Sequence, residues 1–513
     1  MNCVMSHLSE RASARFGNAI ALITDDRTMT FSEVNDEASR FAGGLAALGI
    51  KAGDRVILHL ANQWEWVVAY HAIARVGAVV TPANFLLSVE EVAYIAVDCH
   101  AAVVIAPHGR CLAIQASDKV EVQRFIYTGE DCAPSVASAP LFSPYSMVLD
   151  HPPLRPVTRE PEDLFSIVYT SGTTGAPKGA MLSHRAVYTS TALTGTLHVR
   201  HRGERVVSAL PFAHVYGNVV LHACFLAGMT LITTSRFAAE WALDAIARHK
   251  ATMFEGVPTM YYYMLGHPAL STTDFSSLIR CTVGGQNLPA NKHDEITDAF
   301  GCPLLELWGM TELAGPALTH SSYLQGPAGS VGQVMPGLEI RIVSDADPTL
   351  DLPQGEPGEM LVRGPTVMSG YFGKVDSSAH ALLAGGWLRT GDIACVDRDG
   401  YVWIVDRLKD MIITAGYKIY PAEIEQVLSA HPSIAMAAVV SLQDELKGEI
   451  AKAFIVPTPG AQVDEFQILD HCRRELATYK VPKSVEFVDS LPTTPSGKIL
   501  RRHLRTSDPS PTK

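Results

Sequence analysis

The chain has 513 residues, of which 47% are apolar and 18% charged, and its formal net charge is −12. This length predicts more than one domain and a large core. The acidic balance argues against a nucleic-acid-binding surface, which would need a basic stripe. The nine scattered cysteines form no C-x-x-C pair, which argues against a zinc site and is typical of a reducing compartment. The N-terminus has no apolar signal region, and no run of about 18 apolar residues occurs. We therefore expect a cytoplasmic protein without a membrane span.

The first two-thirds of the chain alternate between strands and helices. The segment 55–84 predicts strand, helix, strand, because an apolar run precedes a 3.6-period stretch and a second β-branched run. The segments 242–265 and 280–312 repeat this alternation. Such alternation predicts an α/β domain with mainly parallel sheets, in which ligands bind at the carboxyl ends of the strands.

The pattern changes after residue 330. Short β runs at 337–344, 358–364 and 401–407 are separated by Gly, Pro and Asp, and they predict an antiparallel, barrel-like β subdomain. The remainder, from 421 to 492, reads helix, strand, strand, helix, strand and predicts a small α+β domain. We place the boundary between a domain of residues 1–406 and a mobile C-terminal domain of residues 407–513. The tail after residue 504 is expected to be disordered.

The stretch "YTSGTTGAPKG", at 169–179, has the composition of a phosphate-binding loop. Its hydroxyl groups and free amides can surround phosphate oxygens, and Lys178 adds a positive charge. It is not the P-loop pattern, because no glycine directly precedes Lys178 and no Ser or Thr follows it. Taken alone, such a loop is also compatible with a solvated turn.

Four further motifs accompany this loop: "LWGMTE" at 307–312, "WLRTGD" at 387–392, "DRLKDMIITAGYKIYPAEIE" at 406–425 and "PTTPSGKILRR" at 492–502. In this order they resemble the adenylate-forming superfamily, which includes acyl-CoA synthetases, adenylation domains and firefly luciferase. The resemblance covers nearly the whole chain. It implies ATP and coenzyme A as substrates and Mg²⁺ as the metal ion.

The resemblance also implies a nucleotide site. Trp308 would stack beside adenine, although a core tryptophan is an equally good reading of that residue. Asp392 would accept hydrogen bonds from the ribose hydroxyls, Glu312 would hold Mg²⁺, and Thr311 would contact the α-phosphate. The full implied nucleotide set is Thr170, Ser171, Gly172, Thr173, Thr174, Gly175, Lys178, Gly284, Gly285, Gln286, Asn287, Leu307, Trp308, Gly309, Met310, Thr311, Asp392, Arg407 and Lys498.

The catalytic residues implied by the resemblance are Lys498, Thr170, Lys178 and His214. Lys498 would bridge the attacking carboxylate and the α-phosphate, where negative charge develops. Taken alone, Lys498 is also compatible with a solvated lysine in a basic tail. Lys409 falls at the expected hinge of the C-terminal domain. Ala415, Gly416 and Tyr417 would then line the channel for the thiol arm of coenzyme A.

The segment "ALPFAHVYGN", at 209–218, corresponds to the acyl-pocket motif of the superfamily. Phe212, Ala213 and His214 offer no carboxylate to pair with an ammonium group, whose unpaired burial would be costly. We therefore expect an aryl or a medium-to-long aliphatic acid without an α-amino group. The pocket implied by the resemblance contains His214, Val215, Tyr216, Gly217, Val257, Met260, Gly284, Gly309, Ala314 and Gly315.

The predicted function is that of an ATP-dependent carboxylic acid:CoA ligase that forms AMP and pyrophosphate through an acyl-adenylate. Three alternatives stay open: an adenylating enzyme that loads a carrier protein, a luciferase-like oxygenase and a non-catalytic nucleotide-binding module. The expected partners are small molecules only, without nucleic acid, and the protein is expected to be a monomer or a homodimer.

Overall fold

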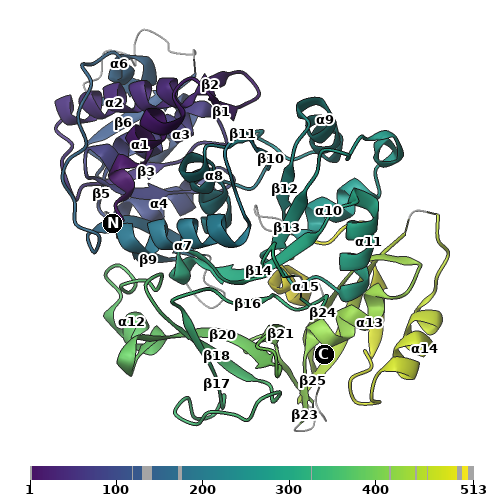
Figure 1. Cartoon of the computed structure of the whole chain (residues 1–513). Helices are drawn as coiled ribbons and strands as arrows, with labels where there is room; N and C mark the ends of the chain where they lie inside the picture. The colour runs from purple at the N-terminus through teal and green to yellow at the C-terminus, as the bar shows by residue number, and fades with distance from the viewer. Residues whose placement is uncertain are drawn as a thin grey trace.

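The computed structural model describes residues 3–117, 120–129, 141–170, 176–324, 326–414, 417–444, 448–458, 460–493 and 499–506. Two large sheets with their helices form the N-terminal part, and a smaller sheet and the C-terminal domain lie beside them (Figure 1). The helices are α1 (Leu8–Phe16), α2 (Phe31–Ala47), α3 (Trp64–Arg75), α4 (Val89–Asp98), α5 (His108–Gln115), α6 (Tyr145–Leu149), α7 (His184–Leu197), α8 (Val215–Ala227), α9 (Ala239–His249), α10 (Pro258–Leu265), α11 (Ala290–Phe300), α12 (Val375–Ala381), α13 (Pro421–Ser429), α14 (Glu465–Glu475) and α15 (Arg501–Thr506).

The first large sheet has seven strands in the order β7-β6-β5-β3-β4-β8-β9. All its neighbours are parallel except β8 and β9, which form an antiparallel hairpin. Strand β4 is buried along its whole length, as expected for a parallel strand covered on both faces. The strands are β3 (Arg55–Leu58), β4 (Val79–Pro82), β5 (Ala101–Pro107), β6 (Arg124–Thr128), β7 (Phe142–Pro144), β8 (Leu164–Thr170) and β9 (Lys178–Ser183).

The second large sheet has nine strands in the order β16-β15-β14-β13-β12-β10-β11-β1-β2. Its central strands are parallel, and β2, β15 and β16 add antiparallel edges. The predicted alternation at 280–312 is confirmed as β13, α11 and β14. The strands are β1 (Ile20–Ile23), β2 (Thr28–Thr30), β10 (Arg205–Val207), β11 (Thr230–Ile232), β12 (Met253–Gly256), β13 (Arg280–Gly284), β14 (Leu304–Met310), β15 (Gly315–Thr319) and β16 (Gln333–Val334).

One hydrophobic core joins the two large sheets. Helices α3 and α8 meet within it: Trp66 and Tyr70 of α3 pack against Phe212, which precedes α8, and His222 of α8. Tyr70 also packs edge-on against Phe165 of β8. The two sheets therefore share one interior, and the amino end of β8 packs against α3.

The third sheet is antiparallel, as predicted, and contains β17 (Glu339–Val343), β18 (Gly358–Arg363), β19 (Leu382–Leu383), β20 (Trp387–Val396) and β21 (Val402–Arg407). Its order is β17-β18-β20-β19, with β21 also paired to β20. Among the described strands this path does not close, so the subdomain is a sheet with edges and not a hydrogen-bonded barrel.

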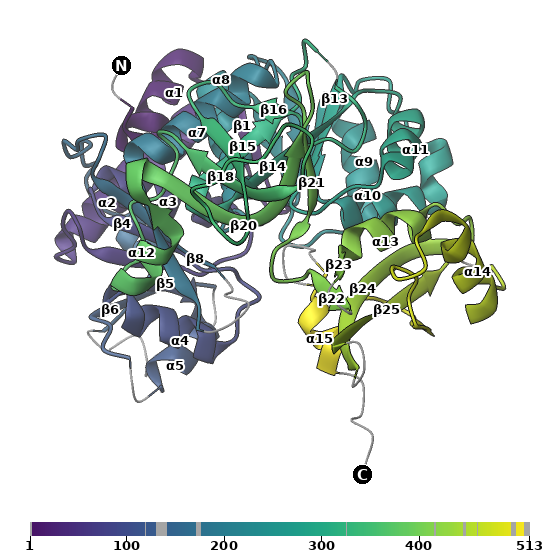
Figure 2. The same cartoon turned by 90° about the horizontal axis from the view of Figure 1, so that it is seen from below.

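The C-terminal domain has its own sheet, in the order β23-β22-β25-β24 with β26 paired to β25. Its strands are β22 (Ile412–Thr414), β23 (Tyr417–Ile419), β24 (Ile434–Asp444), β25 (Gly448–Pro457) and β26 (Ser484–Phe487). Its buried side chains form clusters separate from the N-terminal core. Figure 2 shows this domain, in light green to yellow, beside α9, α10 and α11. The α+β prediction for this part of the chain is confirmed.

Candidate active site

The predicted phosphate-binding loop lies at the tip of the β8–β9 hairpin. Thr170 and Lys178 are register partners at its base, with the Thr170 hydroxyl 3.5 Å from the Lys178 carbonyl oxygen. Ser171, Gly172, Thr173, Thr174 and Gly175 lie outside the described residues. The hairpin fixes where the loop leaves and re-enters the sheet.

Helix α4 holds the base of this hairpin. The Tyr169 hydroxyl donates to Asp98 at 2.7 Å, and the Tyr94 hydroxyl donates to the Pro177 carbonyl at 3.0 Å. Lys374 donates to the second oxygen of Asp98 at 2.7 Å. The sequence motifs did not identify Asp98, because it lies 71 residues before its partner Tyr169. Asp98 holds Tyr169 before the loop and Tyr94 holds Pro177 after it, so both ends of the loop are tied to α4.

Lys178 and Glu312 meet through a residue that the sequence analysis missed. The Lys178 ammonium lies 5.4 Å from the centre of the Tyr371 ring, and the Tyr371 hydroxyl donates to Glu312 at 2.7 Å. Burial raises the pKa of Tyr371, so this phenol stays a donor. Glu312 is itself buried. A donor of this kind fixes the orientation of the carboxylate.

Tyr371 reaches this position because its segment runs along β9. Met181 donates its backbone N–H to Gly370, and Phe372 donates to Gly179. Ala180 and Tyr371 form an isolated β-bridge. No sequence motif marks this pairing, which joins segments almost two hundred residues apart. Sequence reasoning therefore had no signal for Tyr371.

A second group gathers Trp308, Asp392 and Arg407. The Trp308 indole N–H donates to one oxygen of Asp392 at 2.8 Å, and Arg407 Nε lies 3.5 Å from the other oxygen. Asp392 and Arg407 are register partners on β20 and β21. A carboxylate has about four acceptor positions. Asp392 thus keeps acceptor capacity beyond these two contacts.

The predicted glycines lie where strands approach closely. A Cβ on Gly284 would come within 2.3 Å of Leu307, and one on Gly309 within 2.2 Å of the Gly315 carbonyl. Gly285 has φ +88°, a conformation that favours glycine. Gln286 follows directly, and Asn287 donates to the Ile404 carbonyl at 3.3 Å. These residues tie the end of β13 to β14 and β21, and the chain continues from β14 through Met310 to Thr311.

Glu312 is the residue that would hold Mg²⁺, and its surroundings can be compared with those of known magnesium sites. The described residues contain no cluster of three or more His, Cys, Asp or Glu side chains able to hold a metal. One buried carboxylate, supplemented by phosphate oxygens of a substrate, is the arrangement in which Mg²⁺ is usually bound. Glu312 therefore fits as the protein ligand.

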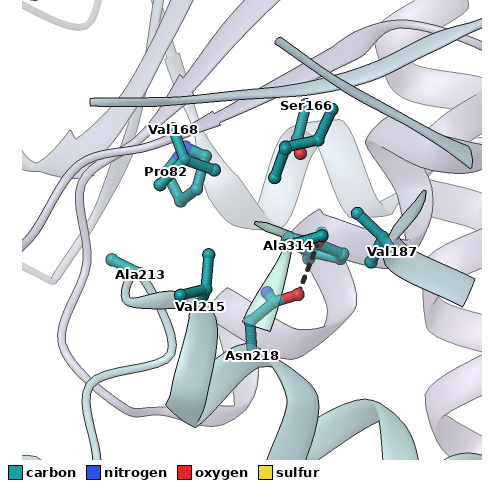
Figure 3. Close-up of a pocket in the computed structure, with 10 residues that line it drawn as sticks. Pro82, Ser166, Val168, Val187, Ala213, Val215, Asn218 and Ala314 are labelled. Atoms are coloured by element: carbon teal, nitrogen blue, oxygen red, sulfur yellow. Dashed lines mark hydrogen bonds between the residues drawn. The ribbon is translucent and has the colours of Figure 1, made fainter. Parts of the chain in front are cut away.

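A small cavity lies between β8, α7 and α8 (Figure 3). Its volume is about 10 Å³, which is room for about one water molecule. Ala314, two residues after Glu312, forms part of its wall. Its lining residues are Tyr70, Pro82, Ser166, Val168, Leu182, Val187, Ala213, Val215, Asn218 and Ala314.

Two residues of the predicted acyl pocket, Val215 and Ala314, line this cavity. The Tyr216 hydroxyl instead lies 2.7 Å from the Thr282 hydroxyl, and His214 caps α8 by accepting the Tyr216 N–H. The remaining predicted residues are not among the lining residues. Val257 and Met260 lie at the start of α10, and a Cβ on Gly217, Gly309 or Gly315 would meet neighbouring protein atoms. The acyl role of these residues stays a prediction.

The hinge and C-terminal predictions fall partly on described residues. Burial lowers the pKa of Lys409 to about 8, and the Arg407 charge contributes. Tyr417 stacks on Tyr479 at a centroid distance of 4.8 Å. Ala415, Gly416 and Lys498 lie outside the described residues.

The described residues on either side of 494–498 are paired with each other or with the C-terminal domain. Thr493 and Ile499 form a β-bridge, and α15 begins directly afterwards. Arg501 binds Glu425 at 2.7 Å and approaches Asp410 at 3.4 Å. The base of this segment therefore belongs to the C-terminal domain.

The comparisons with known proteins agree with this geometry. Residues 9–372 match the AMP-binding enzyme family, and residues 423–498 match the AMP-binding enzyme C-terminal domain. The chain is 36% identical to a feruloyl-CoA synthase of Amycolatopsis sp over 492 residues, covering 95% of this chain and 96% of the relative. It is 33% identical to a long-chain-fatty-acid–CoA ligase of Bacillus subtilis (strain 168) over 532 residues, covering 98% and 94%.

A solved structure is similar over the same extent. The anthranilate CoA ligase AuaEII in complex with anthranoyl-AMP superposes with a TM-score of 0.90 at 29% identity, covering 98% of this chain and 97% of that one. The fold and the site thus define a nucleotide-binding α/β enzyme with a separate C-terminal domain.

The chain belongs to the AMP-binding enzyme family. It is an AMP-forming acid–CoA ligase, whose reaction uses ATP, Mg²⁺ and coenzyme A. None of the helices in the described part of the chain is long and apolar enough to cross a membrane.

Proposed function

We propose that this ligase activates an aryl or a medium-to-long aliphatic acid without an α-amino group. The observation that carries the proposal is the cavity beside Glu312, whose wall includes Val168, Val187, Val215 and Ala314. None of its lining residues is charged, so a substrate ammonium would be buried without a partner. We assign the acyl pocket to this cavity, which has room for about one water molecule and must widen when the acid binds.

The carboxylate of the acid is activated where the cavity approaches Glu312, the residue that we assign to Mg²⁺ and the nucleotide phosphates. Lys178 offsets phosphate charge at the hairpin base, and Tyr371 orients Glu312. When bound, Mg²⁺ neutralises phosphate charge in the nucleotide. We assign Lys498 the bridging of the attacking carboxylate and the α-phosphate, where it stabilises the developing charge. Trp308 and Asp392 bind adenine and ribose, and His214 stands at the entrance of the acyl pocket.

The second step needs a different arrangement of the C-terminal domain. We place the domain boundary between residues 406 and 407, and the hinge at Lys409. Two observations support this: β21 ends at Arg407 in one sheet, and β22 starts at Ile412 in the next. Movement about Lys409 withdraws Lys498 and brings Ala415, Gly416 and Tyr417 to the thiol channel.

The test is a panel of aryl and aliphatic acids in a pyrophosphate-release assay with ATP and Mg²⁺. We expect acid-dependent pyrophosphate release, and AMP release that depends on coenzyme A. Lys498→Ala should abolish release but spare thioester formation from a supplied acyl-adenylate. If AMP release needed a carrier protein in place of coenzyme A, the acid:CoA ligase function would be refuted. Absence of acid-dependent pyrophosphate release would indicate a non-catalytic nucleotide-binding module.

We also propose a cytoplasmic protein that is a monomer or a homodimer. The described cysteines are all free thiols, and Cys281 and Cys302 stay unbonded with their sulfurs 3.6 Å apart. This supports a reducing compartment. Light scattering coupled to size-exclusion chromatography measures the oligomeric state.

A further inference from the structure

The contact between α3 and α8 contains polar side chains in an otherwise apolar core. Tyr70 and His71 come from α3, and Asn218 and His222 come from α8, one turn apart on that helix. Their exposed fractions are 2%, 2%, 8% and 0%. Tyr70 and Asn218 line the cavity. The polar group thus includes two residues of the cavity wall and two histidines that lie outside the lining.

Tyr70 and Asn218 have hydrogen-bonding capacity left. The Tyr70 hydroxyl donates to the Asn218 side-chain oxygen at 3.1 Å, the dashed line of Figure 3. The Asn218 amide nitrogen donates one hydrogen to the Phe212 carbonyl at 3.4 Å. A second amide hydrogen and the lone pairs of the phenol oxygen remain. Burial raises the pKa of Tyr70, so the phenol stays neutral.

Two histidines next to this pair have ring nitrogens without a hydrogen-bond partner among the described residues. The His222 ring lies 4.8 Å from the Tyr70 ring and 5.5 Å from the His71 ring. Both ring nitrogens of His222, and Nε2 of His71, have no hydrogen-bond partner within the described structure. Burial lowers the pKa of both rings, that of His71 to about 3. Each is therefore a neutral imidazole with one donor and one acceptor.

These unpaired groups are costly. A buried polar group without a partner destabilises a fold, because it loses its hydrogen bonds to water and gains none in return. Leucine or phenylalanine in place of His222 would pack against the same rings without that cost. Only Tyr70 and Asn218 of this group face the cavity, so a ligand there that supplies hydrogen-bonding atoms would use their remaining capacity.

We propose that the acid carries a neutral hydrogen-bonding oxygen, a hydroxyl or carbonyl group, on the part that enters this cavity. Asn218 and Tyr70, which line the cavity, bind this oxygen, and His222 packs against the Tyr70 ring outside the lining. The oxygen is neutral because the lining residues include no cation to pair with a second carboxylate. This inference rests on the proposed ligase activity and specifies its substrate class.

Two pairs of acids, each pair differing only in one hydroxyl group, test the proposed oxygen-binding site. We compare kcat/KM for pyrophosphate release between 4-hydroxycinnamic and cinnamic acid, and between 10-hydroxydecanoic and decanoic acid. The enzyme will use either the aryl pair or the aliphatic pair with the higher kcat/KM. Within that pair, we expect kcat/KM for the oxygenated acid to be at least about 10-fold higher, because a site built for an oxygen rejects the analogue that lacks it. Asn218→Leu and Tyr70→Phe should each reduce this ratio several-fold, because both residues line the cavity.

His59→Leu is the matched control, because His59 is also fully buried but lies outside the cavity lining, and it should leave the ratio unchanged. Melting temperatures show that each variant is folded. Equal use of both members of each pair, or variants that keep the wild-type ratio, would overturn the inference while leaving the ligase intact. Absence of pyrophosphate release with all four acids would overturn the proposed acid class itself, and the inference with it.

Discussion

At the scale of single residues, Tyr371 connects two parts of the site that are far apart in the chain. Its ring faces the Lys178 ammonium, and its hydroxyl holds the carboxylate of Glu312. A hydrogen bond to a charged group contributes about 1.5–3 kcal/mol. Tyr371 is thus a positioning residue for the acidic group that we assign to Mg²⁺.

Removal of the Tyr371 hydroxyl should lower activity through Glu312. For Tyr371→Phe we expect kcat/KM for ATP to fall about 10-fold, and the Mg²⁺ concentration needed for half-maximal rate to rise. Tyr263→Phe, at a phenol that is 54% exposed, is the control. Pyrophosphate release measured over a series of Mg²⁺ concentrations tests this prediction. An unchanged Mg²⁺ requirement would contradict the role of Tyr371 in positioning Glu312.

Glu306 gives a prediction about pH. Burial raises its pKa to about 8 from an ordinary value of 4.5, partly offset by the Gly329 N–H. Between these values the folded protein holds a proton that the unfolded chain has released, so stability falls as pH rises through this window. Glu306→Gln should raise the melting temperature more at pH 8 than at pH 5.5. Calorimetry at both pH values checks this, and an equal change at both would show that Glu306 is ionised in the fold.

At the scale of elements, α15 is anchored to the C-terminal domain by charge. The Arg501 guanidinium is shared between Glu425 and Asp410, and Arg505 also reaches Asp410. The Arg501 side chain is only 22% exposed, and a paired guanidinium and carboxylate gain from a bidentate geometry. This contact fixes the C-terminal side of the segment that carries Lys498.

Arg501→Lys should therefore affect adenylation more than thioester formation. Lysine keeps the charge but loses the bidentate geometry, and we expect pyrophosphate release to slow about 10-fold. Thioester formation from a supplied acyl-adenylate should change much less. Arg474→Lys, in an exposed pair with Asp470, is the control. Equal slowing of both steps would indicate a general loss of structure.

At the scale of the whole molecule, the two parts of the chain have separate interiors. The largest cluster of buried side chains extends from Met5 to Val402 and joins both large sheets. The two clusters of the C-terminal domain contain only residues from 412 onward. Separate cores predict separate unfolding units.

Two matched substitutions test this division. Phe254 lies in the N-terminal core and Phe454 in the C-terminal domain, and both are almost fully buried. Truncation of a buried phenylalanine to alanine costs about 3–5 kcal/mol. In scanning calorimetry, Phe254→Ala and Phe454→Ala should each lower a different transition. A single transition lowered equally by both would show that the chain unfolds as one unit.

Much of this architecture was predictable, because it depends on local patterns. The strand–helix alternation at 55–84 and 280–312 is a periodic signal, and the structure confirms both. The grouping of Trp308, Asp392 and Arg407 was implied by the resemblance to the adenylate-forming superfamily, and the structure brings the three side chains together. Asp98 and Tyr371 were not predictable, because their partners are distant in sequence and no motif marks them. Whether the third sheet closes into a barrel depends on which strands pair with one another. Short β runs in a sequence do not specify this pairing.

The bond between the Trp308 indole and Asp392 has a practical consequence. Indole fluorescence responds to the charge and polarity next to the ring nitrogen, and here that neighbour is the carboxylate assigned to the ribose. A nucleotide that engages Asp392 will change the emission of Trp308. We therefore expect nucleotide binding to change the emission of Trp308, one of six tryptophans in the chain, and stopped-flow fluorescence can measure its rate without any attached dye.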